Sequence, residues 1–548
     1  MQPTWLSVIP PLIVIALATI TQRLLFSLVI GLISAALVVN NFSIPTAGSF
    51  LFMRLKDTTE LANLTSWQSF NQCYSLFIVA FLLLLGLLIT MIRHSGAAYA
   101  YGAFVMRNIK TAAGAQRASL LLSSLFFIDD YFSCLTVGSV MQPITDQFKI
   151  SRVKLGVLVN GIAAPLAVLV PLSSWVAYIV GQLRNAGVAD NIDTATLIIA
   201  DPFALYMATI PTMFYALLMV IALWYLACSQ RTYGIIAQHE QIAIAQGNLF
   251  GGKVSVVRRG SDVSPARKSS SALIDFIMPL GLLFTLVIAI MAYSGGWWLC
   301  GGQRTFLGVL QHANSAAALF WSGLCTCIAT GLFFLARGKL TLKEMPSILR
   351  EGYGLMGGSV IMLILIWTLS TILTKDLATG SYLATLLDGT MSPSLFPAVM
   401  FVFAMLVAIM MGSAWGAIGM LIPLALSLLP NLAGLPVPVD VAQLPLVMPT
   451  LGAIVTGAMV SNHMSPIADI MLMTATSAGV YHLDLVKAQL SVAVPVVMAS
   501  AVSFLSMGFM LNAHSFMISI VVSIGTGLLS LVSMLYGLQR IASMRRGT

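Results

Sequence analysis

Long, unbroken apolar runs are the feature that most restricts how this chain can fold. Runs that can cross a bilayer of roughly 30 Å lie near 5–21, 24–40, 74–92, 201–227, 272–293, 311–335, 353–374, 488–511 and 515–537. In lipid such a run becomes a helix, because a helix satisfies its own main-chain hydrogen bonds. Only 8% of the 548 residues are charged, against roughly 25% in soluble domains. This composition excludes an ordinary soluble enzyme, and the unbroken runs argue against a membrane β-barrel.

The basic residues predict which loops lie on the same side of the membrane. Lys and Arg concentrate in loops 93–117, 146–154, 228–271 and 336–352 and in the C-terminal tail. Cytoplasmic loops are enriched in these residues, so we expect these segments inside the cell. Loops 184–200 and 430–445 hold one and no basic residue respectively, so we expect them, and the N-terminus, outside. The net charge of +9 therefore reflects orientation in a membrane, most simply the cell inner membrane, and predicts no nucleic-acid partner.

Four apolar stretches are interrupted by Pro, Gly, Ser or Asp and need a different interpretation. The predicted sides agree only if 118–145 and 393–429 are re-entrant hairpins, the first entering from the cytoplasm and the second from outside. Segments 153–183 and 446–480 then cross as broken helices. The first half makes an odd number of crossings, so the second half runs in the opposite sense. Inverted repeats of this kind are found in many secondary transporters.

We therefore predict an all-α polytopic membrane protein with two inverted repeats, two re-entrant hairpins, two broken helices and about 11 full spans. The predicted parts are a first repeat (1–227), a basic cytoplasmic loop (228–271), a second repeat (272–511) and an extra C-terminal span with its tail (512–548). A short sequence echo supports the repeat. Asn160 precedes Ala164 and Pro165, as Asn462 precedes Ser465 and Pro466.

Two adjacent carboxylates, Asp129 and Asp130, lie in the middle of the first predicted hairpin. Carboxylates in apolar surroundings are costly unless they meet a cation, a proton or a buried donor, so a functional role is the default. The structural alternative is that one of them caps the start of a half-helix. Adjacent helical residues point roughly 100° apart. We expect one aspartate to face the site and the other to hold the hairpin.

The stretch from Asn160 through Ala164 to Pro165 predicts a second polar position. Proline removes a helical donor and leaves an upstream carbonyl without its partner. Such a carbonyl and the Asn amide are suitable ligands for a small hard cation. The alternative is a kinked helix without a ligand.

Small hydroxyl residues and one dense polar cluster complete the predicted site. Ser173, Ser174 and Ser413 mark further breaks, although serine is also common where membrane helices pack together. The cluster lies at 461–469 and contributes Asn462, His463, Ser465 and Asp469. Histidine titrates near neutral pH, but a buried neutral histidine bonded to a carbonyl is the alternative for His463. Asp129, Asn160, Asn462 and Asp469 are the candidate sodium ligands.

No enzyme motif is present in the sequence. It has no GxxxxGK[ST] phosphate loop, no HExxH and no GxSxG. We expect no cofactor beyond a transported or coupling Na+ or H+. The expected partners are the lipid bilayer and a small ion or polar solute, with a homodimer as a candidate assembly.

Four stretches of this chain resemble the NhaC-type sodium/proton antiporter family of the broader ion transporter superfamily. They are FIDDYFSCLTVGSVMQPITDQFKISRVKLG at 127–156, AAPLAVLVPLSSW at 163–175, SAWGAIGMLIPLAL at 413–426 and GAIVTGAMVSNHMSPIADIMLMTATSAGVYHLDLVKAQL at 452–490. The resemblance implies a secondary transporter in which the part bearing the hairpins moves against the remaining helices. Asp129, Asp130, His463, Ser465 and Asp469 match the family pattern.

Two departures from that pattern leave the transported species open. The family pattern usually has Asp where Asn160 and Asn462 stand in this chain. An amide can bind sodium through its oxygen but cannot exchange a proton. We therefore expect monovalent cation/proton antiport first. The alternative is a sodium- or proton-coupled transporter of a small organic solute, such as an amino acid or a carboxylate.

Overall fold

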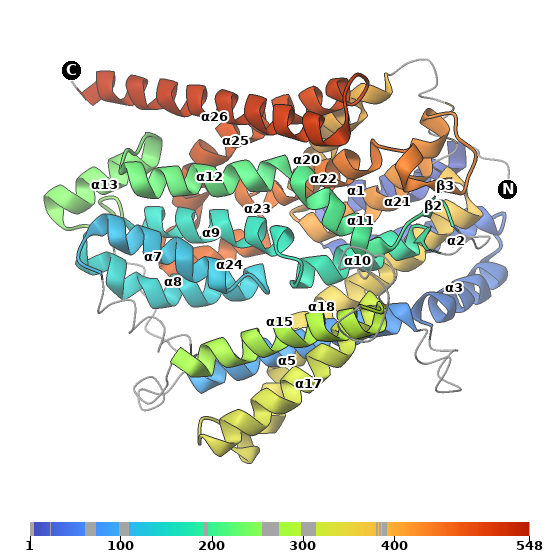
Figure 1. The fold of residues 1–548 in the computed structure, drawn as a ribbon, viewed down its shortest axis with the longest axis horizontal. Helices are drawn as coiled ribbons and strands as arrows, with labels where there is room; N and C mark the ends of the chain where they lie inside the picture. The colour runs from blue at the N-terminus through green and yellow to red at the C-terminus, as the bar shows by residue number, and fades with distance from the viewer. Residues whose placement is uncertain are drawn as a thin grey trace.

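The computed structural model describes residues 5–21, 23–60, 73–97, 109–190, 196–254, 273–297, 314–379, 382, 385 and 392–546. Within these ranges the chain is mostly helical. Ten helices are long and apolar enough to cross a membrane, or up to 11 if one sharply bent pair counts as a span. Most helices run along the long axis of the molecule (Figure 1). The predicted all-α polytopic membrane architecture is confirmed.

The first half of the chain contains two short strands among its helices. Its elements are η1 (Trp5–Val8), α1 (Ile9–Thr21), α2 (Leu24–Val39), α3 (Ile44–Thr59), α5 (Tyr74–Ser95), α7 (Ala112–Leu125), α8 (Asp130–Gln147), α9 (Arg152–Leu169), α10 (Ser174–Asn185), β1 (Val188–Ala189), β2 (Ile198–Ile199), α11 (Pro202–Thr209), η3 (Ile210–Thr212), α12 (Phe214–Ser229) and α13 (Gly234–Gln246).

The second half also combines long helices with one short strand, and it ends in one long helix. Its elements are α15 (Leu273–Ser294), α17 (Ser315–Ala336), η5 (Leu342–Glu344), α18 (Met345–Thr371), the π-helical η6 (Ile372–Asp376), η7 (Pro393–Leu395), α20 (Phe396–Met411), α21 (Ala414–Leu432), β3 (Val439–Asp440), η8 (Val441–Gln443), α22 (Val447–Met459), α23 (Ser461–Met464), α24 (Asp469–Ala478), α25 (His482–Met510) and α26 (Phe516–Arg546).

The two expected hairpins are formed by neighbouring antiparallel helices. α7 packs on α8, and the chain turns between Phe126 and Asp129. This hairpin lies toward the end of the molecule that also holds α13 and the C-terminus (Figure 1). α20 packs on α21 with the turn at Gly412 and Ser413. That second hairpin lies toward the opposite end, beside the strands.

Both expected broken helices are present, and the first is interrupted next to Ser173, as expected there, but not at Pro165. α9 and α10 are separated by 170–173, and α23 and α24 by 465–468. Pro165 lies inside α9, so the break expected there is wrong. Proline removes a single helical bond, and the buried neighbours of Pro165 hold the helix together across that gap. Pro466 does lie in a break. The sequence echo around the two prolines is therefore not a structural equivalence.

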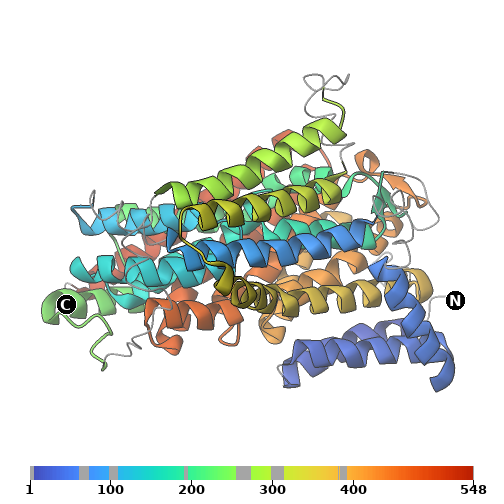
Figure 2. The same cartoon turned by 90° about the horizontal axis from the view of Figure 1, so that it is seen from below.

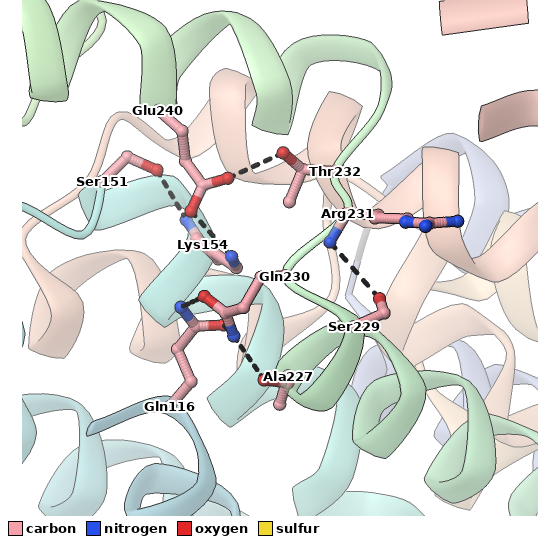
Figure 3. A network of polar contacts seen from close by, with 9 residues as sticks. All are labelled: Gln116, Ser151, Lys154, Ala227, Ser229, Gln230, Arg231, Thr232 and Glu240. Atoms are coloured by element: carbon pink, nitrogen blue, oxygen red, sulfur yellow. Dashed lines mark hydrogen bonds and ion pairs between the residues drawn. The ribbon is translucent and has the colours of Figure 1, made fainter. Parts of the chain in front are cut away.

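Loops that the sequence assigned to one side do lie together. The loops expected outside pair in a small parallel sheet, with Ile198 opposite Val188 on one side and Val439 on the other. At the other end, the Lys154 ammonium contacts the Glu240 carboxylate at 2.7 Å, and the side-chain amides of Gln116 and Gln230 pair at 3.0 Å (Figure 3). Which end faces the cytoplasm remains a prediction.

Three parts of the chain differ from the expected spans. The expected span 201–227 is divided into α11 and α12, with Pro211 in the connecting turn. α3 was not anticipated; it bends away from α2 by 117° and exposes Ile44 and Phe52. These first helices form a group at the edge of the molecule near the N-terminus (Figure 2). α13 was also not anticipated and occupies the first part of the basic loop. Residues 255–272 of that loop lie outside the described residues.

Candidate functional site

Four helices of the hairpins and broken helices begin near the centre of the molecule. α8 begins after Asp129, α10 after Ser173, α21 after Ser413 and α24 after Ala468. The side chains of the first three residues accept hydrogen bonds from main-chain N–H groups of the helix that follows. Helix starts carry partial positive charge, so this centre favours negative groups.

Each hairpin tip packs on the break of a broken helix. The Ser174 N–H donates to the Ile128 carbonyl at 2.8 Å. At the second tip Gly412 has φ +66, and a Cβ there would lie 2.8 Å from Cγ1 of Ile467. Glycine is therefore required at position 412 both by its left-handed backbone and by the close approach.

Aromatic side chains join the second hairpin to the first broken helix. The ring centroids of Trp175 and Trp415 lie 5.7 Å apart, and the Tyr178 hydroxyl donates to the Trp415 carbonyl at 2.5 Å. Tyr178 was not singled out from the sequence, because an aromatic residue inside an apolar run gives no functional signal.

The two adjacent aspartates have different surroundings. Asp129 caps α8 by accepting from the Phe132 N–H at 2.9 Å, and its second oxygen accepts from the Ser174 hydroxyl at 2.9 Å. Asp130 is 1% exposed and accepts from the N–H of the next residue at 3.2 Å. The buried Trp175 indole N–H makes no hydrogen bond to it or to any other group among the described residues. Asp129 therefore holds the hairpin, while Asp130 has few donors.

Asn160 joins the two broken helices. Its Nδ2 donates to the main-chain carbonyl of Asn462 at 3.0 Å, and its Oδ1 accepts from the Thr474 hydroxyl at 3.2 Å. Both partners come from the second broken helix, one on each side of its break. Thr474 had no distinguishing sequence signal. Ala164, one of the predicted ligands, is a buried regular residue of α9, so its carbonyl is not freed by a break.

The side chains of Asn462 and His463 differ in their contacts. Asn462 is 7% exposed, and no side-chain hydrogen bond involves its amide among the described residues. Nδ1 of His463 lies 2.7 Å from the Tyr215 hydroxyl on α12. Its Nε2 is buried and has no hydrogen-bond partner among the described residues. Tyr215 lies in an apolar run, so the sequence gave no reason to select it.

The remaining predicted residues are two serines whose hydroxyls bond to main-chain carbonyls and one exposed aspartate. The Ser465 hydroxyl donates to the Ile409 carbonyl at 3.0 Å and so fixes the break against α20. The Ser173 hydroxyl donates to the Ala167 carbonyl. Asp469 is the first residue of α24 and is exposed. No hydrogen bond links Asp129 or Asp469 to the Asn160–Asn462 pair among the described residues, and a shared sodium site for these four residues stays a prediction.

The described residues contain no group of three or more His, Cys, Asp or Glu side chains that could hold a metal ion. Any cation would therefore be held by isolated carboxylates together with amide, hydroxyl or main-chain oxygens. These are the ligands that sodium and other hard cations accept.

Two known proteins are similar to this chain over most of its length. An uncharacterized protein of Haemophilus influenzae is 28% identical over 505 residues, which cover 92% of this chain and 91% of that protein. The crystal structure of the YdaH transporter of Alcanivorax borkumensis is similar with a TM-score of 0.51 and 13% identity. That match covers 85% of this chain and 89% of YdaH and supports the fold alone.

A family model decides the classification. The model of the Na+/H+ antiporter family matches residues 166–509, which is more than half of the chain and includes the second hairpin and the second broken helix. It confirms the resemblance found in the sequence. The chain therefore belongs to the Na+/H+ antiporter family and is a membrane-embedded secondary transporter.

Proposed function

We propose that the protein exchanges a monovalent cation, first of all sodium, for protons by alternating access. The observation that carries the proposal is the position of Asp130, which is buried and has few donors, beside Asp129, which is occupied by the α8 cap and Ser174. A buried carboxylate with few donors needs a proton or a cation. Because one carboxylate cannot hold both at once, loading the cation releases the proton.

Proteoliposomes with an internal pH dye test this proposal. A sodium pulse on the outside drives sodium in and protons out, so it is expected to alkalinise the lumen, and choline is expected to give no signal. Asp130→Asn should abolish the sodium-dependent proton signal, whereas Asp129→Asn, which can still cap α8, should retain part of it. Normal exchange in Asp130→Asn would refute the assignment.

A second function is supported by the two amides. Asn160 and Asn462 stand where the family pattern usually has carboxylates, and the Asn462 amide has no side-chain hydrogen bond among the described residues. Amides suit a polar organic solute because they both donate and accept. Pulses of amino acids or carboxylates, with and without sodium, decide between the two. Solute-dependent proton or sodium movement without exchange of sodium alone would favour this second function.

The orientation and assembly belong to the proposal as well. The Lys and Arg distribution supports an inner-membrane protein with the N-terminus outside and loop 228–271 and the C-terminus in the cytoplasm. A homodimer is a further hypothesis, which light scattering of the purified protein in detergent would test. Na+ and H+ remain the proposed transported or coupling ions.

A further inference from the structure

Gln489 is an interior amide that the proposed exchange step does not use. It lies on α25 and is 0% exposed. Neither Oε1 nor Nε2 has a hydrogen-bond partner among the described residues. An amide left without partners in a membrane interior is costly, and a polar residue kept there is functional by default.

The side-chain amide of Gln489 lies where a side chain at position 161 would otherwise extend. A Cβ at Gly161 would lie 3.0 Å from Nε2 of Gln489 and 2.9 Å from Cδ1 of Leu223. A side chain at position 161 would therefore force the ends of the Leu223 and Gln489 side chains to shift. The glycine lets the amide of α25 approach the main chain of α9, one residue after Asn160.

The main chain at this point has an unpaired acceptor of its own. In an α-helix the carbonyl of residue 161 accepts from the N–H of residue 165, which is Pro165 here. Proline has no N–H, so the Gly161 carbonyl lacks its helical partner while α9 continues around it. A main-chain oxygen that lacks its helical partner and a buried side-chain amide without a partner among the described residues thus come from neighbouring helices, with the amide next to the Cα of Gly161.

We propose that the Gly161 carbonyl and the Oε1 of Gln489 are ligands of a second sodium site. The proposal rests on sodium being a transported or coupling ion, as proposed above. Both ligands are neutral oxygens. A divalent cation in such a site would keep its full charge without negative ligands, so the site suits a monovalent cation better. Freed main-chain carbonyls serve as sodium ligands in discontinuous membrane helices.

This site differs in kind from the one at Asp130. Neutral ligands take up no proton, so a cation bound between Gly161 and Gln489 is not displaced by protonation. Asn160, the neighbour of Gly161, is already bonded to Asn462 and Thr474. The second site therefore binds sodium independently of the carboxylate and adds to the number of sodium ions bound in each cycle.

The test compares sodium dependence in variants that keep the packing. Gln489→Leu preserves volume and removes the amide, and Pro165→Ala gives the Gly161 carbonyl an intrahelical donor. Each is expected to raise the half-saturating sodium concentration for transport by about tenfold, the effect of losing one interaction with a charged group. Ser491→Ala is the matched control on α25, because the Ser491 hydroxyl donates only within its own helix, to the Ala488 carbonyl.

Sodium-dependent thermal stabilisation in detergent gives the second readout. Asp130→Asn should keep part of the sodium shift, whereas Gln489→Leu should lose part of it. In choline Gln489→Leu should unfold no earlier than the wild type, because an unpaired amide is removed. If Gln489→Leu does not fold, Pro165→Ala alone decides, and unchanged sodium dependence in it overturns the site.

The outcomes separate this inference from the proposed function. A wild type that neither exchanges nor is stabilised by sodium would refute sodium as the ion, and with it both proposals. A wild type that exchanges sodium, with unchanged half-saturation in Gln489→Leu and Pro165→Ala, would refute the second site alone. In that case the Gln489 amide would be satisfied by water.

Discussion

The Nδ2 of Asn160 donates to the main-chain carbonyl of Asn462 across 3.0 Å, and this bond helps to join the two broken helices. The amide is suited to this bond because its nitrogen donates and its oxygen can still accept from Thr474. A carboxylate at the same place would bring two acceptors together. Asn160, which departs from the family pattern, therefore makes a bond that an aspartate could replace only with a proton or a cation present.

Asn160→Asp is expected to make stability depend on sodium. The new carboxylate oxygen would lie against the Asn462 carbonyl, and a buried charge without a partner is unfavourable. Thermal unfolding in detergent should begin earlier in choline than for the wild type. Sodium should restore much of the difference by binding only the folded state.

Asn462→Asp is the control for that result. Because Asn462 takes part in the bond through its main-chain carbonyl, its side chain can change without breaking the link to Asn160. We expect a smaller loss of stability in choline than for Asn160→Asp. Equal losses in both variants, or a sodium shift equal to that of the wild type in Asn160→Asp, would contradict the role of this bond.

Asp129 is expected to matter for stability through its cap. It accepts from the Phe132 N–H and from the Ser174 hydroxyl. Asp129→Ala removes both acceptors and should cost about 1–2 kcal/mol, while Asp129→Asn keeps an oxygen for the cap and should cost less. The ranking of thermal midpoints in detergent checks this. An Asn variant as unstable as the Ala variant would show that the charge, rather than the cap, holds the hairpin.

The sequence was sufficient to predict the coarse fold because few backbone conformations can satisfy their hydrogen bonds in lipid. Long apolar runs become helices, and the Lys and Arg distribution then required two hairpins and two broken helices. It marked both Pro165 and Ser173 as breaks in the first broken helix, but Pro165 costs one hydrogen bond and its buried surroundings keep the helix intact. The break follows at the position where Ser173 can cap a new helix.

The site was predicted less completely than the fold. Polar residues in apolar runs were visible, so Asp129, Asn160 and His463 could be selected. Their partners Tyr215 and Thr474 could not, because an isolated Tyr or Thr in a helix has no sequence signature. Gln489 was missed for the same reason, and its importance depends on Gly161 lying opposite it.

The predicted orientation can be tested by cysteine labelling in intact cells. Val254 is 82% exposed beside the basic loop, and Val437 is 52% exposed in the loop expected outside. In a background without native cysteines, an impermeant maleimide should label Val437→Cys and spare Val254→Cys until the cells are opened. The reverse pattern would invert the topology, and labelling of both in intact cells would contradict the assignment of these loops to opposite sides.

The Lys154–Glu240 pair gives the sharpest prediction for the end of the molecule that holds the basic loops. Lys154 is 1% exposed, and its ammonium lies 2.7 Å from the Glu240 carboxylate, which also accepts from the Thr232 hydroxyl at 2.7 Å (Figure 3). Breaking a buried pair leaves an uncompensated charge, so Glu240→Gln should destabilise the protein by about 3 kcal/mol. Replacing both residues, as in Lys154→Met with Glu240→Leu, removes the charge as well and should cost less than the single change.

The Arg93–Glu351 pair, about 40% exposed on both sides, is the matched control, and Glu351→Gln should cost less than about 1 kcal/mol. Thermal midpoints of these variants in one detergent give the ranking. A double variant less stable than Glu240→Gln would mean that the pair contributes more than it costs to bury.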